Sequence, residues 1–163
     1  MTTGNTRPEH YRVWRRLLRS ASPYGMRDYT KIDAWKLADD LTVAVYAKSR
    51  GFPKDELYGI TSQLRRAISS APANIAEGAS RDSKRDYLRF LYIARGSLSE
   101  AQYFLHLAHR LGYLAPPEAD EMQNQTSKVF ARLHGLIKAV EKETRADQSP
   151  QTVNSQWSVV SSP

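Results

Sequence analysis

The sequence has no cysteine and no long run of apolar residues. Without cysteine the chain cannot form a disulfide framework, a thiolate metal site or a cysteine nucleophile. Its apolar runs are far shorter than the ~20 residues that a membrane-spanning helix needs, so we expect no membrane partner. The first residues include arginines but lack the apolar segment of a signal peptide. We therefore expect a cytoplasmic protein with one core, for which 163 residues suffice.

The motifs of common enzymes and metalloproteins are missing as well. A di-iron bundle needs inward glutamates and a repeated Glu-x-x-His, which this sequence does not contain. His106 and His109 have the spacing of metal ligands on a helix, but two candidates without a carboxylate favour surface histidines. Neither a Gly-x-Ser-x-Gly turn nor a glycine-rich phosphate loop is present. We expect no catalytic residues, no metal and no cofactor, and we interpret the chain as a binding protein.

Positive charge is concentrated near the N-terminus. The net charge is +7, and residues 1–27 contain six arginines against Glu9. Tyr11 and Trp14 are interleaved with four of these arginines, a pattern suited to base stacking and phosphate contact: Arg12, Arg15, Arg16 and Arg19. An anionic membrane surface is the alternative partner, and we prefer nucleic acid. We expect residues 1–27 to be a flexible basic arm; its first 25 residues are either an added arm or upstream sequence that is not translated.

Four segments show helical periodicity, and no segment of comparable length alternates as a strand would. The first helix is predicted over residues 33–50, with Asp33 as its N-cap. The second is predicted over residues 55–77 as one helix kinked at Pro72, because the apolar spacing returns to register beyond the proline. The predicted apolar face of this second helix comprises Leu57, Ile60, Leu64, Ala67, Ile68, Ala71 and Ile75.

The third helix is predicted between Ser83, its N-cap, and Gly112, where it ends. Its apolar positions follow an unbroken heptad spacing: Tyr87, Leu91, Ala94, Leu98, Ala101, Leu105 and Ala108. The fourth is predicted to begin at Pro117, with heptad positions Met122, Thr126, Val129, Leu133, Leu136 and Val140. Connections of roughly 4–6 residues predict an all-α, antiparallel up-down-up-down four-helix bundle over residues 28–145. Residues 146–163 are rich in Ser and Gln, which predicts a disordered tail.

Two of the predicted helices carry a second stripe beside the core-facing one. On the second helix the stripe is polar: Gln63, Arg66, Ser70, Asn74 and Glu77. It is either a solvated face or an interface between copies, with Arg66 and Glu77 pairing across it. On the third helix the stripe is apolar: Phe90, Ile93, Phe104, Leu107 and Leu111. The alternative for this stripe is a wide core helix, and we favour self-association.

Three stretches of the sequence, ELYGITSQLRRAISSAPANIAEG, RFLYIARGSLSEAQ and HLAHRLGYL, resemble the bacterial 23S rRNA-intervening-sequence proteins. The resemblance covers about residues 28–114, and the fourth helix only by pattern. The matching motif positions are Gln63, Arg65, Arg66, Asn74, Glu77, Gly96, Ser97 and Glu100. More distantly, the family is similar to the accessory variability protein of diversity-generating retroelements, which partners a reverse transcriptase and binds nucleic acid. The resemblance implies a four-helix protomer in a ring-like homopentamer, with no established enzymatic activity.

Basic residues of the predicted bundle provide candidate phosphate contacts: Arg65, Arg66, Arg81, Lys84, Arg85 and Arg89. The alternative is a solvated helix start in which Asp82 and Asp86 pair with the arginines. A ring would multiply a weak patch by avidity. We therefore predict a non-catalytic oligomeric scaffold that binds RNA or DNA through phosphate contacts. The rival prediction is a protein–protein adaptor for a nucleic-acid enzyme such as a reverse transcriptase.

Overall fold

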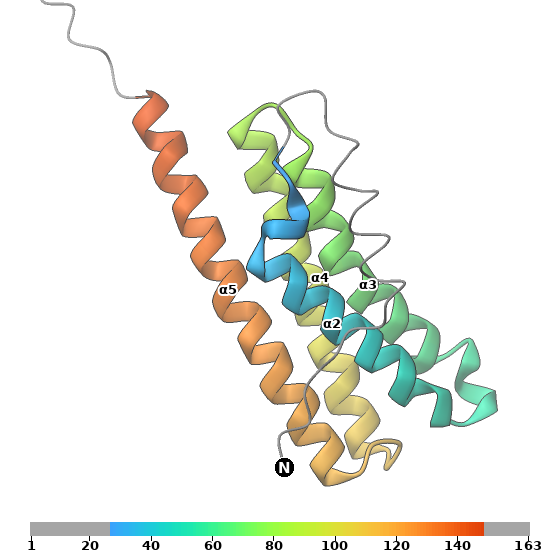
Figure 1. Ribbon diagram of the computed structural model, residues 1–163. Helices are drawn as coiled ribbons and strands as arrows, with labels where there is room; N and C mark the ends of the chain where they lie inside the picture. The colour runs from blue at the N-terminus through green and yellow to red at the C-terminus, as the bar shows by residue number, and fades with distance from the viewer. Residues whose placement is uncertain (1–26, 149–163) are drawn as a thin grey trace, which may run out of the picture.

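Four long α-helices make up most of the computed structural model, which describes residues 27–148 (Figure 1). They are α2 (Asp33–Lys48), α3 (Ile60–Ala79), α4 (Lys84–Arg110) and α5 (Pro116–Gln148). Three short 3-10 helices are η1 (Tyr29–Lys31), η2 (Ser49–Gly51) and η3 (Lys54–Leu57). Between residues 27 and 148 there is no strand, so the predicted all-α fold of four helices is confirmed. Except for Arg27, the predicted arm lies outside the described residues, as does the tail beyond residue 148.

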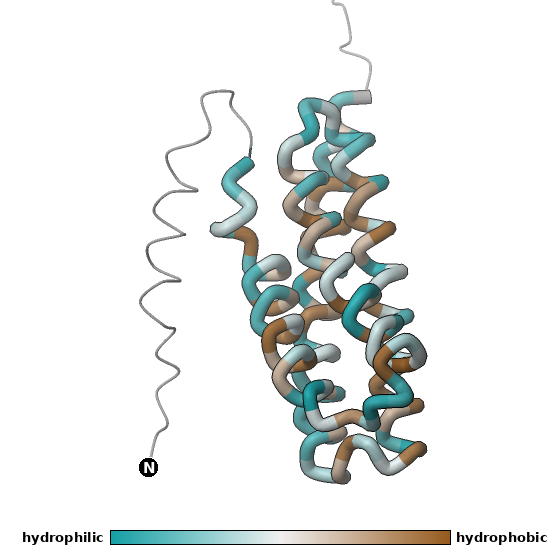
Figure 2. The backbone as a smooth tube through the Cα atoms, turned by 90° about the vertical axis from the view of Figure 1, so that its right-hand side faces the viewer, coloured by the Kyte–Doolittle hydropathy of each residue, from teal (hydrophilic) through white to brown (hydrophobic). Residues whose placement is uncertain are grey.

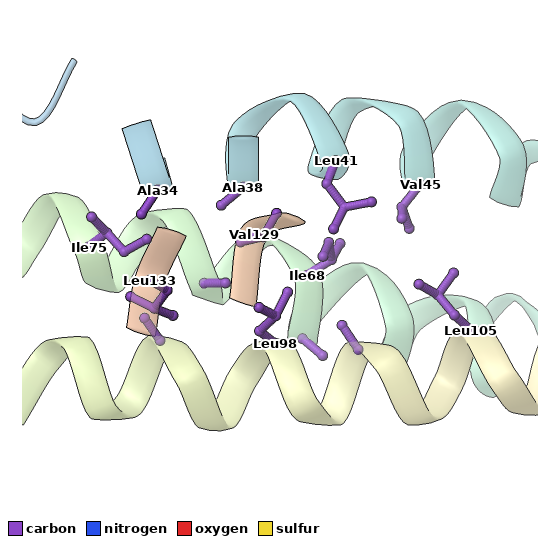
Figure 3. Close-up of a cluster of buried hydrophobic side chains, with 14 of the residues drawn as sticks. Ala34, Ala38, Leu41, Val45, Ile68, Ile75, Leu98, Leu105, Val129 and Leu133 are labelled. Carbon is purple, nitrogen blue, oxygen red and sulfur yellow. The ribbon is translucent and has the colours of Figure 1, made fainter. Parts of the chain in front are cut away.

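The helices form one bundle around a shared apolar core. α2 packs against α3 and α5, and α4 also packs against α3 and α5, with α3 and α4 making the most extensive contact. Apolar residues recur along each helix rather than forming one block, as expected of helices that bury one side in a shared core (Figure 2). Figure 3 shows side chains from all four helices meeting in one core, among them Leu98, Val129 and Leu133.

α4 follows the sequence prediction from end to end. All seven heptad positions from Tyr87 to Ala108 are buried. At its start, the Ser83 hydroxyl accepts a hydrogen bond from the backbone N–H of Asp86 at 3.0 Å, which satisfies a donor that the helix leaves free. At its end, Gly112 adopts φ +77°, and the Tyr113 N–H donates to the Ala108 carbonyl at 2.9 Å. The left-handed glycine and this bond are the usual helix-ending arrangement.

Pro72 lies inside α3, and the helix continues on both sides of it, as predicted. Because proline has no N–H, the carbonyl of Ile68 one turn earlier loses its helical donor. The hydroxyl of Thr42 on α2 supplies a replacement, donating to that carbonyl at 3.2 Å and to the Ala38 carbonyl at 2.8 Å. The proline is therefore accommodated by a polar contact between α2 and α3.

The starts of α2 and α3 differ from the prediction. Asp33 is the first residue of α2 and not its N-cap, which is Ile32; the Asp33 carboxylate binds Lys36 at 2.8 Å instead. α3 begins at Ile60 because residues 54–57 form η3, which turns the chain into the helix. The prediction that Leu57 belongs to the buried face is therefore wrong, since its exposed fraction is 48%.

The later part of α5 also departs from the prediction. Ile137 is buried, whereas Leu136 is only partly buried against the core. The spacing from Met122 to Val140 thus averages 3.6 residues per turn, as in a straight helix, and does not keep the 3.5 of a supercoiled heptad. The helix also reaches Gln148, so residues 146–148, predicted as tail, are helical.

Candidate nucleic-acid interface

The polar stripe of α3 faces α4 and is largely satisfied within the chain. Arg66 forms an ion pair with Glu100 and hydrogen bonds with the Gln63 side-chain oxygen at 3.2 and 3.3 Å. One turn on, the hydroxyls of Ser70 and Ser97 lie 2.9 Å apart. This polar seam therefore joins three stripe residues of α3 to two motif positions of α4.

The remaining stripe residues bind on their own helix or at its end. The Asn74 amide donates to the Ser70 carbonyl at 2.8 Å and to its hydroxyl at 3.0 Å. Glu77 forms an ion pair with Arg81. Within the chain Arg66 and Glu77 thus each have another partner of opposite charge, and their pairing between copies stays a prediction. Helical spacing predicted which residues share a face but could not identify Glu100 as the partner.

Close approach of α3 and α4 depends on Gly78. A Cβ at this position would lie 2.8 Å from the Phe90 Cβ and 2.9 Å from the Tyr87 Cδ2, which no packed structure tolerates without a shift. Phe90 is consequently buried, and the guanidinium groups of Arg81 and Arg89 lie 4.8 and 5.3 Å from its ring centroid. Phe90 is thus covered by its own chain, which contradicts its assignment to a surface between copies.

The basic ridge at the start of α4 divides into paired and unpaired residues. Lys84 contacts Asp147 at 3.0 Å and Glu143 at 3.5 Å, and the hydrogen bond with Asp147 raises its pKa. Arg85 and Arg89 are exposed, and no carboxylate within residues 27–148 forms an ion pair with either. The aspartates expected to pair with them do not; Asp86 instead accepts from the Ser83 hydroxyl at 3.1 Å.

Arg65 lies apart from this ridge, near the connection between α2 and α3. Its Nε donates to the Ser49 hydroxyl at 2.8 Å, and its guanidinium lies 5.2 Å from the Tyr46 ring centroid. The predicted basic residues therefore do not form one patch. The four arm arginines lie outside the described residues: Arg12, Arg15, Arg16 and Arg19.

The second apolar stripe of α4 is partly exposed. Ile93 and Leu111 have exposed fractions of 43% and 48%, whereas Phe104 and Leu107 are half-buried against the core. Tyr103, which the sequence analysis missed, is 58% exposed and packs edge-on against Phe104 with ring centroids 5.4 Å apart. Its position on the far side of the heptad seam was visible in the sequence, but a lone tyrosine is common on protein surfaces.

Residues 27–148 contain neither a cluster of metal-ligand side chains nor a helix suited to cross a membrane. They contain no group of three or more side chains of the types that hold metal ions. None of the helices in this part of the chain is both long and apolar enough to cross a bilayer.

Comparison with known proteins bears on the fold and the family. The model of a family described as 23S rRNA-intervening sequence protein matches residues 30–135. A comparison with curated proteins finds no match. Among solved structures, a protein of unknown function from the S23 ribosomal protein family of Bacteroides thetaiotaomicron is similar, with a TM-score of 0.60 and 22% identity. The alignment covers 64% of this chain and 98% of that one, and at this identity it supports the fold alone.

Proposed function

The chain belongs to the 23S rRNA-intervening sequence protein family, and on that premise we propose that it is a non-catalytic oligomeric scaffold that binds RNA or DNA. Each protomer would be an up-down-up-down bundle, which the short connections between successive helices favour. Copies would dock through α4 and hold nucleic acid through phosphate contacts. The proposed ring is the homopentamer that the sequence resemblance implies.

The observation that carries the proposal is the exposed apolar stripe of α4. Ile93, Tyr103 and Leu111 each leave about half of their surface to solvent on a helix whose opposite face is already buried in the core. Burial of apolar area is the main driving force for association. A second copy is the occupant that this stripe fits, because the polar seam beside it is closed within the chain and needs no further partner.

Nucleic-acid contact is proposed for the two unpaired arginines of the ridge, Arg85 and Arg89. A single protomer offers few free cations there, since Lys84 and Arg81 already neutralise carboxylates. Several copies on one strand would convert weak contacts into useful affinity. Arginines that contact phosphates without reaching base edges give little sequence preference.

Assembly can be tested by replacing Ile93 with a charged residue. We expect Ile93→Asp to convert the oligomer to a monomer in sedimentation equilibrium, with unchanged helical circular dichroism. Val43→Asp is the matched control, because Val43 is a 65% exposed apolar residue on α2 and should leave the mass unchanged. A wild-type protein that stays monomeric when concentrated, or an Ile93→Asp oligomer of unchanged mass, would exclude docking through α4.

Phosphate contact can be tested by the salt dependence of binding to single-stranded RNA and DNA. The slope of log K against log salt should be about −0.7 per phosphate contacted. The double variant Arg85→Gln/Arg89→Gln should make the slope shallower, whereas Lys128→Gln/Lys142→Gln on α5 removes the same charge elsewhere and should not. Equal slopes for the two double variants would rule out the ridge as the binding surface.

An adaptor for a nucleic-acid enzyme is the second candidate function. It is favoured by the accessibility of the Arg66–Glu100 pair, whose side chains are 61% and 38% exposed. In this case Arg66→Ala should abolish capture of the enzyme and leave nucleic-acid affinity nearly intact. If Arg66→Ala lost enzyme capture and nucleic-acid affinity together, the result would favour the scaffold function instead.

A further inference from the structure

A cavity of about 440 Å³ lies where the connection between α2 and α3 meets the start of α3. In Figure 1 this connection is the turquoise loop where α2 ends, away from the first and last described residues. The apolar part of the lining comes from three consecutive or nearby residues, Phe52, Pro53 and Leu57. Volumes of 300–1,000 Å³ are typical of small-molecule sites, so the size alone suits a small organic ligand.

The charged part of the lining is entirely positive. Arg50, Lys54 and Arg65 line the cavity, and no carboxylate does. No ion pair joins any of these three residues to another residue in the part of the chain that the structure describes. Three cations around one apolar space repel each other, and an anion placed among them would relieve that repulsion.

Arg65 is held in place before any ligand arrives. Its Nε donates to the Ser49 hydroxyl and its guanidinium covers the Tyr46 ring, which leaves the terminal nitrogens to bind an oxyanion. A side chain fixed in this way loses little freedom on binding. Arg65 is also one of the family-motif positions and one of the candidate phosphate contacts named in the sequence analysis.

Thr61 provides an independent sign of a missing partner. It is 3% exposed, it lines the same cavity, and its hydroxyl has no hydrogen-bond partner among the described residues. Buried hydroxyls are nearly always bonded, so an unbonded one beside a cavity suggests that the partner is a bound molecule. The start of α3 lies beside the cavity, but the Glu56 carboxylate accepts from the Ile60 N–H at 3.1 Å and offsets the positive potential of the helix end. The positive charge of the cavity therefore comes from its three basic side chains.

From these observations we propose that the cavity binds an organic phosphate monoester with an apolar or aromatic body. A phosphate monoester carries a charge of about −1.5 to −2 and three acceptor oxygens, which matches three cations and a hydroxyl donor better than a single carboxylate does. The body of the ligand packs on Phe52 and Leu57. The ligand is either a free small molecule or the 5′-phosphorylated end of a nucleic-acid strand, since both present this chemistry.

Titrations followed by amide NMR and calorimetry test the site with phenyl phosphate as the probe. We expect saturable shifts at the amides of Leu57 and Thr61, and binding at least tenfold weaker for inorganic phosphate and for phenol, which each supply half of the chemistry. Uniform weak shifts over all lysines and arginines, or equal binding of phosphate and phenyl phosphate, would overturn the proposal.

Variants separate a binding site from a structural defect. Lys54→Gln should lower the affinity for phenyl phosphate roughly tenfold, as expected for a lost charge-assisted contact, while Lys128→Gln should leave the affinity unchanged. Thr61→Val should raise the melting temperature of the free protein and yet weaken binding; a merely structural hydroxyl would leave the affinity unchanged.

Oligonucleotides distinguish the two sources of the phosphate. Tighter binding of a 5′-phosphorylated than of a 5′-hydroxyl oligonucleotide, lost in Lys54→Gln, would identify the strand end as the source. Equal binding of the two oligonucleotides would identify the free small molecule, provided that phenyl phosphate binds as expected.

Discussion

The contacts that α4 makes with α3 and with α5 use different kinds of side chain. Toward α3 the contact uses small residues and polar pairs, with Gly78 against Phe90 and Ser70 against Ser97. Toward α5 it uses large aliphatic side chains inside and ion pairs at the rim, such as Lys84 with Asp147. Small residues fix the distance between helices because they have no flexible volume to yield, whereas aliphatic side chains can adjust their rotamers. We therefore expect the α3–α4 contact to be the more rigid side of the bundle and the α4–α5 contact to be the more adaptable one.

The largest effect is expected on the α5 side, inside the core. Leu133 is fully buried and belongs to the same core as Leu98 (Figure 3). Leu133→Ala should lower the free energy of unfolding by about 2–5 kcal/mol, because it removes buried surface and leaves a cavity. Urea denaturation measures it. A loss below that of the half-exposed control Leu111→Ala would show that α5 contributes little to the core.

The next largest effect is expected where α4 contacts α3. Gly78→Ala places a methyl group against Phe90 and Tyr87, so the expected loss in the free energy of unfolding is about 1–3 kcal/mol despite the gain in helix propensity. Gly135→Ala on α5 is the control, since nothing lies within 4 Å of its added Cβ. It should be neutral or stabilising. Equal outcomes at the two glycines would remove the distinction between the two sides of α4.

A smaller effect, of opposite sign, is expected at Tyr87. Its hydroxyl is buried without a partner among residues 27–148, so Tyr87→Phe should stabilise the protein by about 1 kcal/mol. Burial also raises the pKa of Tyr87, so below pH ~10 the phenol is neutral in both states. Above that pH only the unfolded state ionises, and stability is lost as the pH rises toward the folded pKa.

Thermal unfolding between pH 8 and 11 checks this prediction. Tyr87→Phe should lose less stability than wild type across the alkaline range. Part of the remaining dependence comes from Tyr92 and Tyr113, whose pKa values are raised by a hydrogen bond to Glu141 and by burial respectively. Lys48 and Lys84 add to it, because hydrogen bonds with Glu118 and Asp147 raise their pKa values. Identical pH profiles for the two proteins would show that the Tyr87 phenol is solvated.

The smallest effect is expected at the rim of α5. Lys84 is partly exposed and bridges the exposed carboxylates of Glu143 and Asp147, so Lys84→Gln should lower the melting temperature only slightly at low salt. At ~1 M salt, where charges are screened within ~3 Å, the variant and wild type should unfold together. A difference that persists at high salt would mean that the lysine packs against apolar surface through its stem.

Features within one helix could be predicted from the sequence. The heptad spacing of α4 identified its buried side chains, Ser83 and Gly112 identified its ends, and the apolar register across Pro72 indicated one continuous α3. Each of these follows from local rules: the helical period, capping and the conformations open to glycine. The family motifs added the positions of the polar seam but not its contacts.

Features that depend on a partner from another helix could not be predicted. The spacing placed Arg66 on a stripe, but only the packing of α4 brings Glu100 to it. Leu57 fits a helical period and yet lies in η3, because the connection must turn before α3 begins. The Thr61 cavity was missed for the same reason, since its walls come from η2, η3 and α3 together.

Both boundaries of the described chain meet the start of α4. Arg27 donates to the Arg81 carbonyl at 3.3 Å and lies over Tyr87, while Asp147 near the other boundary binds Lys84. The rotation that relates copies in a ring leaves the position of each atom along the ring axis unchanged. In a cyclic assembly Arg27 of every copy, held against Arg81 and Tyr87, would thus lie at one level along the ring axis.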